Sequence, residues 1–160
     1  MAIKPIRLLG DPVLRTKCAF IPKIDNNIKQ LIKDLLDTTN MDGRAGVSAN
    51  QIGVSLRAFS LYIDEKLDYI INPEITYLSP ELQADEQEGC LSIPGKWYLT
   101  NRSAKATCQG IDLSGKTKTI TGEGILARAL QHECDHLDGK LFIDRLQGKI
   151  KRQAYRELHL

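Results

Sequence analysis

The sequence predicts an α+β fold, with small antiparallel β-sheets packed around one central helix at about residues 124–138. Helix-type patterns stand near both ends of the chain, and strand-type runs lie together between them instead of alternating with helices. The central helix is apolar over most of its circumference, which is typical of a buried helix. The chain has 160 residues, enough for a single domain with its own core, expected to span 1–160.

The composition excludes several classes of protein. A hydrophobic content of 42% and a charged content of 26% are those of an ordinary globular protein, and a net charge of +2 argues against specific nucleic-acid binding. No apolar run reaches the length of a membrane span or a signal peptide, so we expect a cytoplasmic monomer without membrane contact. In that reducing compartment the four scattered cysteines are expected to be free thiols.

The first third of the chain predicts two helices and a segment of small residues. Asp11-Pro12 begins a short helix, because proline suits the first helical position. A longer amphipathic helix is expected from Asp25 to about Asp42, with its apolar residues on one stripe. Residues 44–53 are rich in small side chains. They form either a tight loop beneath a helix or a place where a ligand approaches the backbone closely.

Strand-type runs occupy the middle of the chain. Residues 58–63 and 69–71 flank a polar turn and predict a hairpin, and Asn72-Pro73 is expected to end its second strand. The further strand candidates are 75–78, a turn and short strand within 87–95, 99–107 and 117–121.

The segment after the central helix is expected to be short and basic. Residues 141–143 predict a last short strand, and 144–160 predict a mostly solvated helix. No repeat, low-complexity stretch or linker interrupts the chain, in agreement with one domain.

The central helix carries the candidate site. Apolar residues recur at helical spacing from about Gly124, and Gly139 stands where a left-handed residue would end the helix. Residues 132–136 read His-Glu-x-x-His. Imidazoles four residues apart project from one helix face and can bind one divalent metal ion, and the adjacent glutamate can act on a metal-bound water. The plainer alternative is two surface histidines with a solvated glutamate, but burial of the helix favours the metal site.

A third ligand is needed, and spacing alone leaves two candidates. Cys90 lies in a segment of acidic and small residues, whereas Glu157 follows the second histidine by 21 residues, as in zinc peptidases with a later glutamate ligand. Cys134 is a poor candidate, about 200° around the helix from the first histidine. The two cysteines expected to lie in the core are Cys18 and Cys108.

Asp135 is expected to have a partner. It lies on the buried helix close to the candidate ligands, and an unpaired buried carboxylate is costly. Arg102 is the expected partner, and the alternative is an exposed Asp135.

Two segments together resemble signature motifs of the peptide deformylase family. Residues 88–92 (Glu-Gly-Cys-Leu-Ser) and 131–136 (Gln-His-Glu-Cys-Asp-His) match the second and third motifs of that family in full. The resemblance runs through nearly the whole chain, from residue 10 to residue 144. It weakens the alternative ligand Glu157, which leaves the other motifs unexplained.

The first family motif, Gly-φ-Gly-φ-Ala-Ala-x-Gln with φ apolar, is matched only in part by residues 44–51. The positions that are kept are Gly46, Ala49 and Gln51. Arg44 replaces a glycine and Ser48 replaces an alanine. If position 44 requires a left-handed backbone, arginine would strain the loop. The alternative function is therefore a deformylase-like protein that binds peptides or acts weakly.

The resemblance implies a complete catalytic site. The implied ligands of one divalent metal ion, with water in the fourth position, are Cys90, His132 and His136. Iron(II) is the expected native metal, with zinc, nickel or cobalt as alternatives. By the same resemblance, Glu133 takes the proton of the water and passes it to the leaving amine. The side-chain amide of Gln51 and the backbone N–H of Leu91 are the implied oxyanion donors.

The resemblance also implies the substrate, the N-formyl group of formylmethionine at the start of nascent polypeptides. Gly46 is expected to pair its backbone with the substrate as an added strand. Ile125 and Ala129, with Val47 or Ala45, are expected to line the pocket for the methionine side chain. A contact with the ribosome near the exit tunnel is implied through the C-terminal segment, which is short in this chain.

Overall fold

The computed structural model describes residues 2–160 and has the expected α+β order. The α-helices are α1 (Asn26–Thr39), α2 (Gly124–Leu137) and α3 (Gly148–Glu157). The short 3-10 helices are η1 (Pro12–Arg15), η2 (Ala49–Ile52) and η3 (Phe142–Arg145). The strands are β1 (Gly46–Ser48), β2 (Ala58–Ile63), β3 (Lys66–Leu78), β4 (Leu82–Gln83), β5 (Gln87–Cys90), β6 (Ile93–Leu99), β7 (Arg102–Ser103), β8 (Lys105–Ile111) and β9 (Thr117–Glu123).

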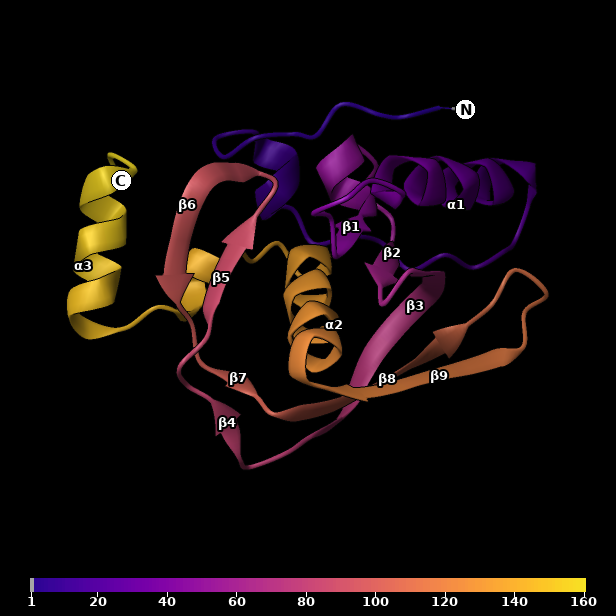
Figure 1. Cartoon of the computed structure of the whole chain (residues 1–160). Coiled ribbons are helices and arrows are strands. Elements are labelled where there is room, and N and C mark those ends of the chain that lie inside the picture. The colour runs from indigo at the N-terminus through magenta and orange to yellow at the C-terminus, as the bar shows by residue number, and fades with distance from the viewer. Residues whose placement is uncertain (1) are drawn as a thin grey trace.

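The main sheet has five antiparallel strands in the order β1-β2-β3-β8-β9. Two smaller sheets pair β4 with β7 and β5 with β6. Helix α2 stands at the centre, with the main sheet on one side and the β5–β6 ribbon on the other (Figure 1). This arrangement is the predicted one, and it brings the end of β5 next to the central helix.

Three apolar clusters hold these layers together. One lies between α2 and the main sheet and includes Phe59 and Leu130; a second lies beneath α1 and includes Leu35. The third joins β6, η3 and α3 around Phe142. Helix α2 contacts the first cluster with its apolar side, which leaves its histidine side to face β5.

The predicted helices are present, with local reasons for their ends. The Asp25 side chain accepts a hydrogen bond from the N–H of Ile28 at 3.0 Å and caps α1, and Gly139 ends α2 with a left-handed φ of 74°. The last helix begins at Gly148 and ends at Glu157, so it is shorter than the predicted 144–160. Within residues 2–160, no helix combines the length and the apolar character needed to cross a bilayer.

Asn72-Pro73 does not end a strand, contrary to the prediction, because β3 continues to Leu78. The pairing of β3 with β8 is interrupted here by a bulge between Ile71 and Glu74, and a bulge accommodates a proline that lacks an N–H. Asn72 takes a φ of 51° and binds both backbone groups of Ile21 at 2.8 Å. The bulge therefore anchors the N-terminal segment to the sheet.

The predicted strand at 141–143 is also wrong, because Phe142 and Ile143 belong to η3 and Leu141 directly precedes it. All three side chains are buried, and a short apolar run does not distinguish a strand from a buried helical turn. Asp144 decides the outcome: its carboxylate accepts a hydrogen bond from the N–H of Leu141 at 2.9 Å and closes the turn.

Candidate metal centre

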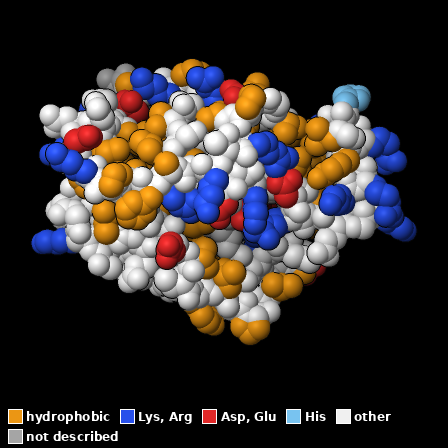
Figure 2. Space-filling model, turned by 180° about the vertical axis from the view of Figure 1, so that it is seen from behind, with side chains coloured by type: hydrophobic (Ala, Val, Ile, Leu, Met, Phe, Trp, Pro, Cys, Tyr) orange, Lys and Arg blue, Asp and Glu red, His pale blue; other side chains and the backbone are white. Residues whose placement is uncertain are grey.

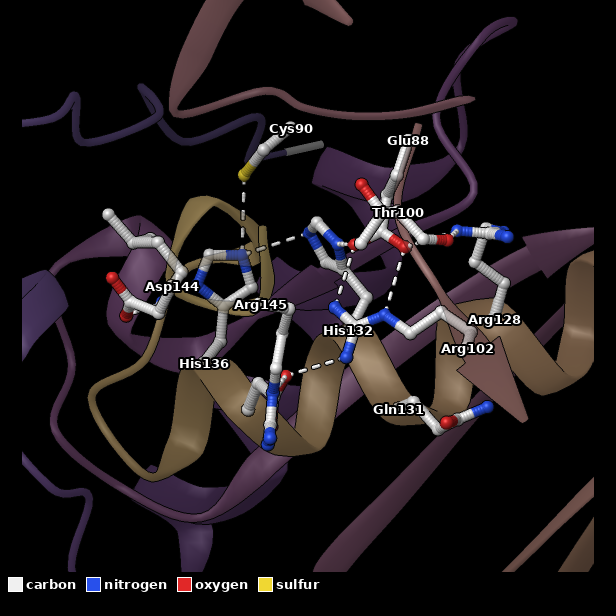
Figure 3. A network of polar contacts seen from close by, with 12 residues as sticks. Glu88, Cys90, Thr100, Arg102, Arg128, Gln131, His132, His136, Asp144 and Arg145 are labelled. Carbon is white, nitrogen blue, oxygen red and sulfur yellow. Dashed lines mark hydrogen bonds and ion pairs between the residues drawn. The ribbon is translucent and has the colours of Figure 1, made fainter. Parts of the chain in front are cut away.

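One thiol and two imidazoles converge where β5 meets α2. The Sγ atom of Cys90 lies 3.3 Å from Nε2 of His136, and that nitrogen lies 3.2 Å from Nε2 of His132 (Figure 3). The three atoms all lie within 4.8 Å of one another. A thiolate with two imidazole nitrogens is a donor set for zinc or another divalent transition metal, so these residues fit a metal ion.

The orientation of the His132 ring supports a metal site. Its Nδ1 lies 2.7 Å from Oε2 of Glu88, and an ionised carboxylate can only accept a hydrogen bond. Nδ1 therefore carries a proton, and Nε2 is the ring nitrogen that faces Cys90 and His136. Burial opposes protonation, but the hydrogen bonds to Cys90 and Glu88 raise the pKa of His132 well above its usual value. A more basic imidazole is a stronger ligand.

His136 is held without a second hydrogen bond. Its Nδ1 is buried and has no partner among residues 2–160. Burial, followed by the charge of His132, lowers the pKa of His136 well below its usual value. A neutral imidazole is the form that binds a metal ion, and this ring is neutral at ordinary pH.

Glu88 is the centre of a buried ion network. Arg102 donates to both of its carboxylate oxygens, at 3.0 and 2.7 Å, and Arg128 donates to Oε1 at 2.9 Å (Figure 3). Burial raises the pKa of Glu88, but the hydrogen bonds from His132 and Arg102 outweigh it and hold the pKa far below its usual range. Glu88 is thus a fixed anion that orients a candidate ligand.

The predicted pair of Arg102 and Asp135 is confirmed, with Nη1 at 2.7 Å from Oδ2. Arg145 binds the same carboxylate, at 2.6 Å from Oδ1. Neither Glu88 nor Arg128 is predicted from the sequence as a functional residue. The one available signal was the position of Glu88 inside a recognisable motif, and nothing marked Arg128 as its partner.

The surroundings of Glu133 differ from those of Glu88. Its side chain is buried beside the ligand cluster, and Oε2 has no hydrogen-bond partner in the described part of the chain. Burial is the largest influence and raises the pKa of Glu133 to about 7. A carboxylate with this pKa can take up and release a proton near neutral pH.

Gln51 is oriented by the small-residue segment, which forms β1 and η2. The N–H of Ser48 donates to Oε1 of Gln51 at 3.0 Å. The amide nitrogen is thereby turned toward Ser92 Oγ at 3.1 Å and Cys90 Sγ at 3.6 Å. The Ser48 hydroxyl donates to Oδ1 of Asn50 at 2.7 Å, and the Asn50 amide donates to the carbonyl of His136 at 2.6 Å. The segment is therefore tied directly to α2.

Arg44 is accommodated without backbone strain. The left-handed conformation falls on its neighbour Gly43, with a φ of 83°, and not on Arg44. The Arg44 guanidinium donates to the carbonyl of Thr38 at 2.6 Å, near the end of α1. Arg44, which stands where the family motif has glycine, thus links the end of α1 to the segment that leads into β1.

A cleft of about 690 Å³ opens in front of the cluster. Of the predicted site residues, those that line it are Ala45, Gly46, Gln51, Cys90, Leu91, Ile125, Ala129, His132 and Glu133. Arg128, which no sequence pattern marks, also lines it. Val47 does not: its side chain is fully buried in the cluster beneath α1, because neighbouring residues of a strand point to opposite faces.

The remaining candidates lie elsewhere. Glu157 is on α3 and accepts a hydrogen bond from Tyr98 at 3.3 Å, outside the ligand cluster. The Sγ atom of Cys134 lies 4.0 Å from that of Cys108, on the sheet side of α2. Cys18 and Cys108 are buried in the core, as predicted.

Comparison with known proteins agrees with this geometry. Residues 3–152 match the family model of polypeptide deformylase. The peptide deformylase of Acidothermus cellulolyticus is 46% identical, with 98% of this chain and 88% of the relative covered. That of a Parafrankia species is 44% identical, with 99% and 86% covered. A crystal structure of a peptide deformylase from Legionella pneumophila superimposes with a TM-score of 0.88 at 39% identity, covering 99% of this chain and 94% of that one. The chain therefore belongs to the polypeptide deformylase family.

Proposed function

We propose that Cys90, His132 and His136 hold the metal ion with which the chain, as a member of its family, hydrolyses the N-formyl group of new polypeptides. The observation that carries this proposal is the convergence of the three ligand atoms within 4.8 Å beside the buried Glu133. We propose iron(II) as the native metal, with zinc, nickel or cobalt as alternatives, because all accept thiolate and imidazole ligands. When bound, such an ion would polarise the formyl carbonyl and lower the pKa of water enough for it to lose a proton near neutral pH.

Glu133 is the proposed general base. The raised pKa, about 7, suits a group that takes a proton from the attacking water and returns it to the leaving amine. The absence of a hydrogen-bond partner on Oε2 within residues 2–160 supports this role, since no ion pair there neutralises the carboxylate.

Gln51 and Leu91 are the proposed donors to the oxyanion. The fixed orientation of the Gln51 amide supports its part, because a preorganised donor needs no rearrangement during the reaction. Leu91 lines the cleft directly after Cys90, which supports a contribution from its backbone N–H. One such donor is worth about a hundredfold or more in rate.

The substrate peptide is proposed to add to the free edge of the main sheet. Gly46 belongs to β1, which is an edge strand, and edge strands present unpaired backbone groups. Ile125 and Ala129 lie along the cleft on α2 and are proposed to contact the methionine side chain. Ile125 is 68% exposed, so it has apolar surface available for a ligand.

We also propose a single catalytic domain that acts as a monomer in the cytoplasm, where nascent chains are made, and that contacts the ribosome near the exit tunnel. Basic side chains on the α3 side of the molecule support that contact; they project from the right edge of the surface in Figure 2. The exposed ones on this helix are Lys149, Lys151, Arg152 and Arg156. Such side chains are attracted to the phosphates of RNA.

An acyl-selectivity assay tests the proposed function. Protein purified without oxygen is analysed for metal and supplied with formyl-Met, acetyl-Met and unblocked Met peptides. We expect one metal ion per chain, rapid release of formate, far slower release of acetate and no cleavage of peptide bonds. Equal rates on formyl and acetyl peptides would indicate a broader deacylase. Tight binding of formyl peptides without turnover would favour the peptide-binding alternative.

A further inference from the structure

Gly46 lies directly against the carboxylate of Glu133. A Cβ atom built on Gly46 would lie 2.9 Å from Oε1 and 3.1 Å from Cδ of Glu133. A Cβ atom essentially never lies within 3.0 Å of a non-bonded heavy atom, so a side chain at position 46 would require a neighbour to move. The backbone of Gly46 is not in the left-handed region, and alanine could adopt it. The requirement for glycine is therefore one of contact, not of conformation.

Of the two neighbours that an added methyl group would meet, only the Glu133 side chain can move easily. On its other side, the same Cβ would lie 3.0 Å from the carbonyl oxygen of Ser60. That carbonyl belongs to β2, which pairs with β1 in register, so it is held by the sheet. The Glu133 carboxylate is the end of a flexible side chain. A methyl group at position 46 would therefore displace Glu133 and leave the sheet in place.

Glu133 has few other contacts that fix its orientation. Oε2 has no hydrogen-bond partner among residues 2–160, whereas Glu88 in the same cleft accepts hydrogen bonds from three side chains. The Glu133 carboxylate packs against the backbone of Gly46.

We infer that Gly46 is a positioning residue for Glu133, because its missing side chain provides the space that the carboxylate occupies beside the ligand cluster. This inference rests on the proposed role of Glu133 as general base. It gives Gly46 a task that is separate from backbone pairing with the substrate. The two tasks have different kinetic signatures: displacement of the base lowers kcat, whereas loss of substrate pairing raises KM.

The first test is the Gly46→Ala variant, loaded with metal and assayed on a formyl-Met peptide. We expect one metal ion per chain, a KM within about threefold of the parent and a kcat lowered at least tenfold, as for a displaced general base. An unchanged kcat, or a rise in KM alone, would overturn the inference. Failure of the proposed function is a different result, namely normal turnover by Glu133→Ala.

A double-mutant cycle supplies a measurement that does not depend on activity. Thermal unfolding of the metal-free protein is compared for the parent, Gly46→Ala, Glu133→Ala and the double variant. We expect Gly46→Ala to lower Tm less in the Glu133→Ala background, because the atoms that its methyl group meets are gone. Folding of the double variant but not of Gly46→Ala would support the inference in the same way. The inference would be contradicted if Gly46→Ala lowered Tm equally in the parent and in the Glu133→Ala background. Failure of both Gly46→Ala and the double variant to fold would also contradict it.

Discussion

Glu88 and Glu133 line the same cleft and are almost equally buried, at 4% and 3% exposure, but their carboxylates have opposite surroundings. Glu88 accepts hydrogen bonds from two arginines and from His132, and its pKa is held far below the usual range. The Oε2 atom of Glu133 has no partner in the described chain, and burial raises its pKa to about 7. Burial alone does not decide what a carboxylate does; the donors around it do.

The difference separates two tasks of one site. A carboxylate that stays charged at every working pH can orient a ligand but cannot carry a proton. A carboxylate that titrates near neutrality can carry one, and environments that push two pKa values apart identify these roles. Glu88 is thus suited to hold His132, and Glu133 is suited to exchange protons with a substrate.

The largest expected effect is on turnover. Glu133→Ala should keep the fold and the metal but lower kcat by about 10²–10⁴, the usual contribution of a general base. Metal analysis and formate release measure the two properties separately. Cys90→Ala is the contrasting variant and should lose metal and activity together. Near-normal turnover by Glu133→Ala would mean that another group takes the proton, and full metal occupancy in Cys90→Ala would remove the thiol from the ligand set.

The second effect is on metal affinity and stability. Glu88→Gln removes the anion that Arg102 and Arg128 share. Arg102 keeps its pair with Asp135, but Arg128 loses its charged partner, and breaking a buried ion pair costs about 3–5 kcal/mol. Losing the acceptor for His132 Nδ1 should weaken metal binding about 10–100-fold. Competition with a chelator and urea unfolding measure these quantities.

Glu74→Gln is the matched control for that experiment, since Glu74 is an exposed residue of β3. It should leave both the metal affinity and the urea midpoint unchanged. If Glu88→Gln behaves in the same way, the ion network around Glu88 does not support the site.

The third effect concerns the stability of the metal-free protein against pH. The folded-state pKa of Glu133 is raised to about 7, so the native state binds a proton more tightly than the unfolded chain, and stability falls as pH rises between about 4.5 and 7. Glu133→Gln is neutral and avoids this loss. It should stabilise the metal-free protein at pH 8 on the order of 3 kcal/mol, since a tenfold change in proton affinity corresponds to about 1.4 kcal/mol.

Glu88 should show the opposite sign in the same unfolding experiment. Its folded-state pKa is depressed, so its contribution is present above the ordinary carboxylate pKa of about 4.3 and is lost as pH falls below it. The Glu88→Gln variant should therefore differ from the parent most at neutral pH and least in acid. A common pH dependence for both glutamine variants would contradict the contrast between the two glutamates.

The smallest expected effect concerns the apolar part of the cleft, to which neither glutamate contributes. Ile125 and Ala129 can contact a flexible side chain but offer it no polar partner. Replacing methionine by norleucine in the substrate should therefore cost less than about tenfold in kcat/KM, because apolar pockets discriminate weakly between similar side chains. A larger loss would point to a specific contact with the sulfur atom.

The sequence predicted those features that a local pattern determines. The apolar period and Gly139 predicted α2 to within a residue, and the motif at residues 132–136 predicted that His132 and His136 lie on one face of it. The pair of Arg102 and Asp135 followed from the cost of a buried charge on that helix.

Features that depend on distant segments could not be predicted. The partners of Glu88 are Arg102 and Arg128, which lie 14 and 40 positions further along the chain. Only the folded structure brings the three side chains together. Asn72-Pro73 is typical of a strand end, and no local pattern predicts the hydrogen bonds of Asn72 with Ile21, 51 residues away. Val47 was assigned to the cleft because β1 was too short to show its alternation, which places this side chain in the core.

The tie between Asn50 and His136 has a consequence for how the molecule is made. Both histidines of the candidate metal centre lie in the second half of α2, 42 and 46 positions after Cys90, and the Asn50 amide donates to the carbonyl of His136 across 86 positions. During synthesis the N-terminal part emerges first. Until α2 has been translated, the chain carries the thiol but neither imidazole of this cluster, and the segment of Gln51 lacks its hydrogen bond to α2. Assembly of the cluster of Cys90, His132 and His136 is therefore a late event in the biosynthesis of this protein.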